Sequence, residues 1–350
     1  MKKLLILIFF IFSLFSCKEL TENESEFSYF SEQFADLKIL RYQIPGFENL
    51  SLDQKKLVYY LTEAGLSGRD IMYDQNYRHN LKIRRALENI HISYRGDKNN
   101  DQWKSFETYL KRIWFSNGIH HHYSNDKFTP GFSSEYLQKL LSETNIKLEE
   151  EAFNVIFNEE DVKKVNLDAS KGLVIGSAVN FYDPDITQED VDNFYENLSV
   201  PNPKKPISLG LNSKLVRVNG VVEEKVWKKG GMYSASIEKI IENLEKAKKY
   251  VENQKQADAF DLLIQYYETG DLEVWDEYNV AWVETTEGDV DYINGFIEVY
   301  NDPKGYRGSY ETVVQIKDFE MSKKMTALSE NAQWFEDSSP IMDKQKKRMW

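Results

Sequence analysis

The chain has 350 residues, of which 57 are acidic and 44 are basic, so its net charge is −13 at pH 7. Nucleic-acid binding requires a concentrated basic patch, and this acidic balance argues against a nucleic-acid partner. The length allows two domains, and the single cysteine, Cys17, allows no intrachain disulfide.

The first residues have the pattern of an export signal. Lys2 and Lys3 precede a mostly apolar run over residues 4–15, which is shorter than the roughly 20 residues of a membrane-spanning helix. Ser16 then precedes Cys17. A small residue before a cysteine indicates a bacterial lipoprotein processing site, at which the lipidated cysteine would anchor the protein to a membrane. An ordinary cleaved signal peptide with an incidental cysteine is the alternative.

We therefore expect residues 1–16 to be a signal peptide and residues 17–36 to be a polar tether. The protein is expected to be exported and lipid-anchored in the bacterial cell envelope, either in the periplasm or on the outer-membrane surface.

Apolar side chains at helical spacing predict that the first half of the chain is mostly helical. Ser51 and Gln54 form a start signal for the first helix. The expected helices cover residues 50–68, 69–91, 103–114, 133–141, 159–165 and 187–198.

The second half adds a few strands to further helices. Alternating polarity predicts strands over residues 207–218 and 221–226, paired around Asn219-Gly220, and over residues 294–300. We expect helices over 234–252, 256–269, 271–279 and 317–335 and an extended segment over 280–283, and residues 313–316 form an apolar run. Together these elements predict an α+β fold that is rich in helix and has a minor sheet.

Motifs for self-contained catalysis are missing from this sequence. It has no HExxH zinc motif, no GxSxG elbow and no phosphate-binding loop. His120, His121 and His122 are consecutive, and consecutive side chains rarely converge on one metal ion. We therefore expect these histidines to form a surface or cleft loop.

Three blocks carry a resemblance to a known family. They are Trp114-Phe115-Ser116-Asn117-Gly118 with the following loop to Phe128, Gly230-Gly231-Met232-Tyr233-Ser234 with the helix after it, and Gly295-Phe296-Ile297-Glu298 through Arg307-Gly308. In this order they resemble the dipeptidyl peptidase III family, and the resemblance is to the Bacteroidetes-type members. These are zinc exopeptidases that remove dipeptides from the amino terminus of short peptides.

The resemblance implies two lobes around a wide cleft. Residues 37–311 would form a peptide-binding lower lobe with a sheet core of about five strands, against which the peptide lies as an added strand. Residues 312–350 would begin a helical upper lobe. The family's zinc motifs, HExxGH and a later glutamate, would lie beyond Trp350, so the full-length enzyme is expected to use zinc while this chain supplies no catalytic residue and no zinc ligand.

The resemblance implies that particular residues of this chain bind the substrate. Asp291 falls on the family's acid that receives the free amino terminus of the substrate. The family's next tyrosine falls on Ile293, so Tyr292 could replace it only if the strand register shifts. Asn294 is a further expected contact, and Glu298 is the next carboxylate to consider.

Tyr123, in the early loop, is expected to wall a pocket for a substrate side chain.

Two functional hypotheses follow. The first is the amino-terminal half of a zinc dipeptidyl peptidase, which is truncated and is expected to be inactive by itself. The second is a peptide-binding surface lipoprotein that has no chemistry. They differ in whether the coding sequence continues beyond Trp350 into an HExxGH segment.

Overall fold

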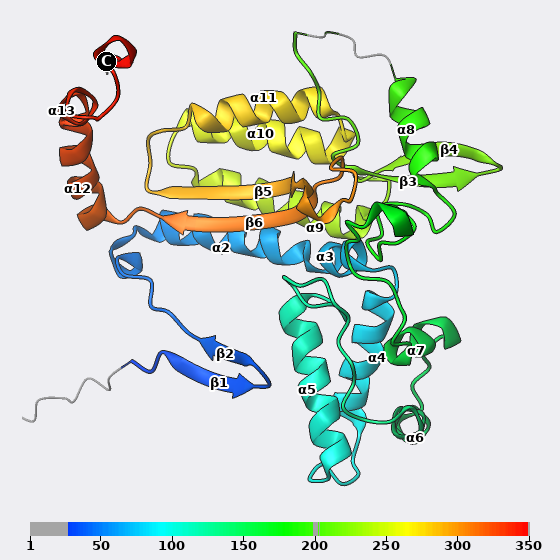
Figure 1. Cartoon of the computed structure of the whole chain (residues 1–350). Coiled ribbons are helices and arrows are strands. Elements are labelled where there is room, and N and C mark those ends of the chain that lie inside the picture. Colours follow the sequence, from blue (N-terminus) through cyan, green and yellow to red (C-terminus); the bar gives the residue numbers. More distant parts are fainter. Residues whose placement is uncertain (1–26, 199–201, 203, 349–350) are drawn as a thin grey trace, which may run out of the picture. The chain divides into compact units, whose positions relative to one another are not determined.

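A computed structural model describes residues 27–198, 202 and 204–348, so the predicted signal peptide and Cys17 lie outside the described residues. The chain divides into two units, Met1–Ile44 and Pro45–Trp350. The described part of the first unit is an antiparallel hairpin of β1 (Phe30–Phe34) and β2 (Leu37–Leu40) (Figure 1). Strand β1 therefore lies inside the stretch predicted to be a tether, where Phe30 faces Leu40 across the pair.

Helices dominate the first part of the second unit. Ser51 caps the first of them, and its side chain and that of Gln54 bond reciprocally to each other's backbone. The helices are α2 (Leu52–Ser67), α3 (Arg69–Asn76), α4 (Asn80–Ser93), α5 (Asp101–Ser116), α6 (Ser134–Thr144), α7 (Glu150–Phe157) and α8 (Gln188–Glu196).

Two of the helical predictions in this part need correction. The single helix predicted over 69–91 is two helices, because Tyr77 is extended at a φ of −170°. Residues 159–165 are not helical. Their backbone pairs instead with a neighbouring segment, where Ala178 N donates to Lys163 O at 2.9 Å and Val179 N donates to Lys164 O at 3.1 Å.

The remaining part alternates strands and helices. A hairpin of β3 (Ser213–Val218) and β4 (Val221–Val226) turns at Asn219-Gly220, where both φ angles are positive as predicted. The further elements are α9 (Ser234–Ala247), α10 (Gln254–Thr269), α11 (Leu272–Val283), β5 (Val290–Glu298), β6 (Ser309–Ile316), α12 (Phe319–Glu330) and α13 (Ala332–Asp337). Residues 280–283, predicted to be extended, are the last turn of α11.

The α+β class is confirmed, whereas a single sheet of about five strands is not what the described residues form. Their six strands make three separate antiparallel pairs. Side chains take the place of further strands beside β5 and β6. Gln75 Oε1 accepts a hydrogen bond from Tyr310 N at 2.8 Å, and Gln256 Nε2 donates to Val290 O at 3.0 Å.

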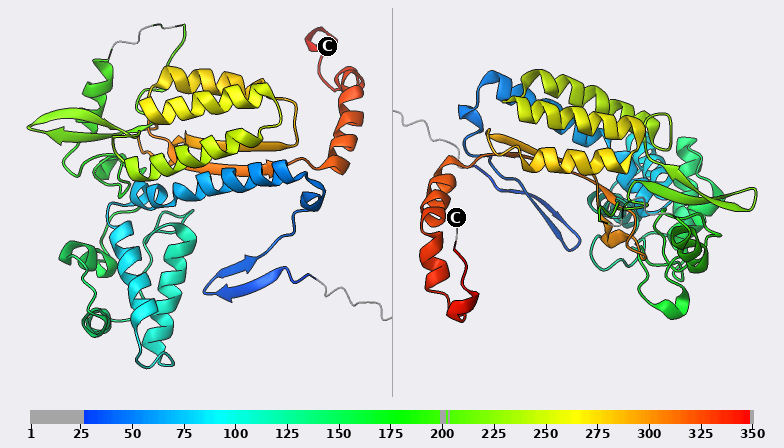
Figure 2. Two further views of the ribbon diagram at one scale, coloured as in Figure 1. Left: turned by 180° about the vertical axis from the view of Figure 1, so that it is seen from behind. Right: turned by 90° about the horizontal axis from the view of Figure 1, so that it is seen from above.

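Two hydrophobic cores hold the second unit. One lies between the β5–β6 pair and the helices α2, α9 and α10, and it contains Trp227, Tyr267 and Phe296. The other joins α4, α5, α6 and α7 around Trp103 and Phe106. Figure 1 and the left view of Figure 2 show α10 and α11 along one side of β5 and β6 and α2 along the other. None of the described helices is both long enough and apolar enough to span a membrane.

The end of the predicted lower lobe at residue 311 falls inside β6, which continues to Ile316. A boundary between two folding units is not expected within a strand that remains paired, because Thr312 and Val314 still face Asn294 and Tyr292 across the ladder. After Ile316 the chain forms α12 and α13, and neither helix has a buried residue.

Candidate functional site

Strand β5 presents two chemically different faces, because successive side chains of a strand point to opposite sides. Tyr292, Asn294 and Phe296 are buried, whereas Asp291 is exposed and Ile293 is partly exposed. The only register shift in the pair lies between Phe296 and Glu298, after these residues. The structure therefore places Ile293, and not Tyr292, on the same face as Asp291.

The Asp291 carboxylate is held in one orientation and has one oxygen available. Its Oδ1 accepts a hydrogen bond from the indole Nε1 of Trp282 at 3.0 Å and one from Tyr292 N at 2.8 Å. The same indole N–H also points at Tyr292 O, at 3.0 Å. Within the described chain, Oδ2 of Asp291 has no hydrogen-bond partner. An ionised carboxylate with a free oxygen can bind an ammonium group through charge-assisted hydrogen bonds.

Tyr292 and Asn294 lie in the core beneath this face. The Tyr292 ring meets that of Phe260 edge-on at 4.6 Å, and burial raises the pKa of its hydroxyl. Asn294 accepts a hydrogen bond from the hydroxyl of Tyr267, and its Nδ2 donates to the hydroxyl of Tyr310 at 3.1 Å. Both side chains therefore support β5 from below and do not reach the surface that carries Asp291.

Glu298 ends β5 on the surface, close to Glu311 of β6. Burial and the neighbouring charge of Glu298 raise the pKa of the Glu311 carboxyl. The two acids repel each other, so a cation near this end of the pair would be stabilised.

Tyr123 lies in the loop that follows α5 and is 85% exposed. Its ring meets that of His122, which in turn meets Phe115, with centroid separations of 4.9 and 5.0 Å. No hydrogen bond connects Tyr123 with Asp291 among the residues whose positions are described. The loop thus presents an exposed aromatic surface.

The three consecutive histidines do not converge on one point, because the rings of His121 and His122 stack at 4.4 Å while His120 is turned into the core. His120 is buried and its Nε2 lies 3.0 Å from Val162 O, and burial lowers its pKa to about 4. His121 uses Nδ1 to accept hydrogen bonds from Tyr123 N and Ser124 N, both at 3.1 Å. Within the described ranges, no three histidine, cysteine, aspartate or glutamate side chains lie close enough together to hold a metal ion. The residues present here do not fit the zinc site that the family resemblance implies, and no chemical step through zinc is assigned to them.

A buried ionic cluster that the sequence analysis missed fixes the connection between β5 and β6. The guanidinium of Arg307, which is fully buried, donates to the hydroxyls of Tyr182 at 3.0 Å and Tyr195 at 2.6 Å. Asp302 accepts the Tyr182 hydroxyl at 2.7 Å and the N–H groups of Tyr306 and Arg307. The signal was present, because Asp302 and Arg307 both belong to the block that carries the family resemblance.

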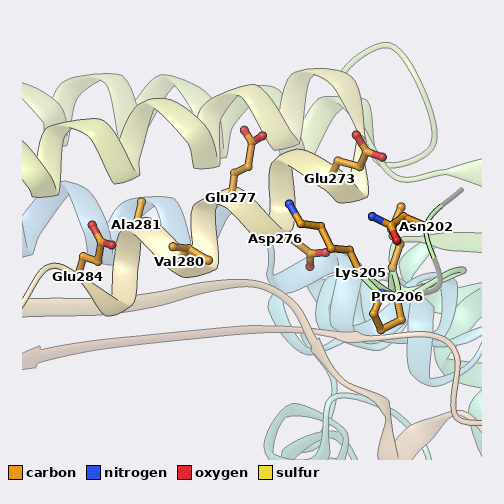
Figure 3. A pocket seen from close by; sticks show the side chains of 10 residues that line it. Asn202, Lys205, Pro206, Glu273, Asp276, Glu277, Val280, Ala281 and Glu284 are labelled. Carbon is orange, nitrogen blue, oxygen red and sulfur yellow. The ribbon is translucent and has the colours of Figure 1, made fainter.

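Two pockets lie near α11. The larger, about 710 Å³, runs along the outer side of α11 and is lined by Glu273, Asp276 and Glu277 of that helix and by Lys205 of the segment opposite (Figure 3). A smaller one, about 220 Å³, is bordered by Asp291 and by the turn that precedes β5. Only the smaller pocket adjoins Asp291, so we regard it, and not the larger pocket, as part of the candidate site.

Comparisons with known proteins agree on one family. The family description "Peptidase family M49" matches residues 148–346, which is more than half of the chain. Dipeptidyl peptidase 3 of Dictyostelium discoideum is 22% identical over 264 residues, 69% of this chain and 37% of that protein. Dipeptidyl peptidase 3 of Homo sapiens is 33% identical over 103 residues, 29% of this chain and 14% of that protein.

Solved structures show the same fold. The structure of DPP III from Caldithrix abyssi has a TM-score of 0.59 and 19% identity, covering 87% of this chain and 47% of that one. That of dipeptidyl-peptidase III from Corallococcus sp. strain EGB has a TM-score of 0.56 and 14% identity, covering 87% and 46%.

These matches define the class of the protein by its family and by its helix-rich α+β fold. The chain belongs to peptidase family M49. It spans well under half the length of the curated relatives that it matches.

Proposed function

We propose that this chain forms the peptide-binding half of a zinc-dependent dipeptidyl peptidase, which removes dipeptides from the amino terminus of short peptides. The observation that carries this proposal is the Asp291 carboxylate. It is exposed, it is oriented by the Trp282 indole, and one of its oxygens is open to a ligand. An enzyme that removes dipeptides must recognise the free amino terminus of its substrate. A carboxylate can do this, because it pairs with a charged ammonium group and not with a neutral acetylated end.

The strand spacing limits where the peptide can lie. A peptide paired to the outer edge of β6 would lie two strand spacings, about 10 Å, from β5. An aspartate side chain on β5 cannot reach that far. A peptide whose amine binds Asp291 therefore crosses the exposed face, beside Ile293 and Val313, which face each other across the ladder. In this arrangement Tyr123 is an additional candidate contact, and Glu298 is the next carboxylate to consider for the amine.

We further propose export and attachment to the cell envelope through a lipid on Cys17. The support is the order of charged, apolar and small residues before that cysteine. In the proposed enzyme a zinc ion would supply the chemistry that activates water and polarises the scissile carbonyl, and the residues described here would not hold that ion.

The amine contact is tested by a double-mutant cycle on the full 350-residue chain. The ligands are an amidated tetra-alanine peptide with a free amine and its acetylated counterpart. We expect Asp291→Asn to weaken free-amine binding at least roughly tenfold, because a lost charge-assisted partner costs on the order of 2–5 kcal/mol. Acetylated peptide should be almost indifferent. Titration by NMR gives both affinities, and a coupling energy near zero would place the amine elsewhere.

A metal measurement tests whether the residues of this chain bind zinc by themselves. We expect the untagged 350-residue chain to retain no stoichiometric zinc after purification, because His120 points into the core while His121 caps its own loop. Elemental analysis showing one zinc per chain, lost on His121→Ala, would contradict this expectation. Release of dipeptides should then require zinc ligands that the residues described here do not supply.

A further inference from the structure

The backbone at the start of β5, directly before Asp291, is fixed by hydrogen bonds to side chains from other elements. The carboxylate of Glu252, in the connection between α9 and α10, accepts hydrogen bonds from Asp289 N and from Val290 N, both at 2.9 Å. It also accepts one from Nε2 of Gln54 on α2, at 2.8 Å. Backbone N–H groups that converge on a carboxylate form a strong anion site, so Glu252 binds the backbone of this turn much as a ligand would be bound.

Gln256, a residue of α10, binds the carbonyl group of Val290. Its Nε2 donates to Val290 O at 3.0 Å, and its Oε1 accepts a hydrogen bond from Glu252 N at 2.9 Å. Both backbone groups of Val290 are therefore bonded to one pair of side chains, in the manner of a neighbouring strand. Val290 is the residue immediately before Asp291, so its backbone sets where the Asp291 side chain starts.

Gly288 shows how closely Glu252 approaches the turn. A Cβ atom at this glycine would lie 2.5 Å from Oε2 of Glu252, and its φ is +119°, a conformation that other residues rarely adopt. The turn is thus shaped around the carboxylate. Trp282 holds the other side, since its indole N–H contacts both Oδ1 of Asp291 and Tyr292 O.

We infer that Glu252 is the positioning residue for the amine-binding group, and that it acts by fixing the backbone before Asp291 without touching the peptide. This inference rests on the proposed function. It assigns peptide recognition partly to the α9–α10 connection, a segment outside the three blocks that resemble the family. The chemistry of the recognised group is that of a primary α-ammonium at the end of an extended peptide.

The test compares Glu252→Gln and Glu252→Asp with Glu245→Gln, which removes the same charge from the exposed side of α9. The full 350-residue chain is titrated with the free-amine and acetylated tetra-alanine peptides. We expect both Glu252 variants to lose about threefold to tenfold in free-amine affinity, as is typical when a support of a binding group is removed. Acetylated-peptide affinity and the control should stay within about twofold.

Glu252→Asp separates position from charge, because it keeps the carboxylate but shortens its reach by one methylene. Amide exchange at Asp289 and Val290 should also accelerate in both Glu252 variants of the free protein. In the Asp291→Asn background, a change at Glu252 should cause no further loss for the free-amine peptide.

The outcomes separate the inference from the proposed function. If Asp291→Asn abolishes the preference for a free amine while both Glu252 variants keep it, the inference is overturned and the proposed function stands. If Glu252→Asp binds like the wild type while Glu252→Gln does not, Glu252 acts by charge and the positioning role is likewise refuted. If Asp291→Asn changes nothing, both ideas fall together.

Discussion

At the scale of single residues, the candidate site combines one group that sequence comparison could locate with several that it could not. Asp291 could be predicted because the family that this chain resembles has an acid at a fixed distance before Gly295-Phe296, and that acid receives the amino terminus of the substrate. Trp282 and Glu252 were not found, because they come from other segments, and contacts between distant segments leave no local pattern. Sequence alignment could not decide whether Tyr292 contacts the substrate. The register of β5 directs its side chain into the core.

The buried Arg307 gives a prediction at this scale. Arg307→Met keeps much of the side-chain volume but removes a cation that donates to Tyr182 and Tyr195 and lies 3.8 Å from the Asp302 carboxylate. Because Asp302 would remain buried beside no cation, we expect a loss of about 3–5 kcal/mol in the free energy of unfolding. Urea unfolding measures it.

The double variant Arg307→Met, Asp302→Asn serves as the control. It should recover part of the loss, because no uncompensated charge is then left in the core. A single variant as stable as the wild type would show that the cluster does not stabilise the β5–β6 connection.

At the scale of elements, most of the long helices and the β3–β4 hairpin could be predicted, since their periodicity and turn residues are local. Two of the failures involve segments that contact other parts of the chain. Residues 159–165 have helical spacing, but the backbone of Lys163 and Lys164 pairs with Ala178 and Val179. Residues 280–283 look extended by composition, yet they continue α11 and bring Trp282 to Asp291.

The contact between β5 and α11 gives a second prediction. A Cβ atom on Gly295 would lie 2.4 Å from Cη2 of Trp275, which is itself buried. Gly295→Ala should therefore overpack the junction and cost about 1–3 kcal/mol of unfolding free energy. Thermal unfolding followed by circular dichroism checks the change.

Gly220→Ala separates crowding from backbone strain. Nothing lies within 4 Å of a Cβ at Gly220, although its φ is +82°, so only the backbone conformation is penalised there. If Gly295→Ala proved no more harmful than Gly220→Ala, α11 would not pack against β5 as described.

At the scale of the whole molecule, buried His120 makes stability depend on pH. Burial lowers its pKa from 6.5 to about 4 in the folded chain. Between these values the unfolded chain binds the additional proton, so stability rises with pH across this window and is lost as the pH falls from 6.5 towards 4. The full effect of this one group is on the order of 3 kcal/mol.

His120→Gln removes this titration while keeping a donor for Val162 O. Its unfolding free energy, measured at several pH values, should be flatter between pH 6.5 and 4 than that of the wild type. Equal slopes for the two proteins would show that His120 is free to take up a proton in the folded state.

The Gln75 side chain described in the fold has a consequence for solubility. It covers the outer edge of β6 only at Gly308 and Tyr310, to which its amide bonds at 3.1 and 2.8 Å. Because the outward direction repeats every second residue, the backbone of Thr312 and Val314 also points away from β5, and within the described residues it has no partner. Val313, 41% exposed, lies between them.

Such an edge is a template for association between chains. At high concentration this chain should therefore form edge-paired aggregates that begin at β6, and a lysine in place of Val313 should delay them.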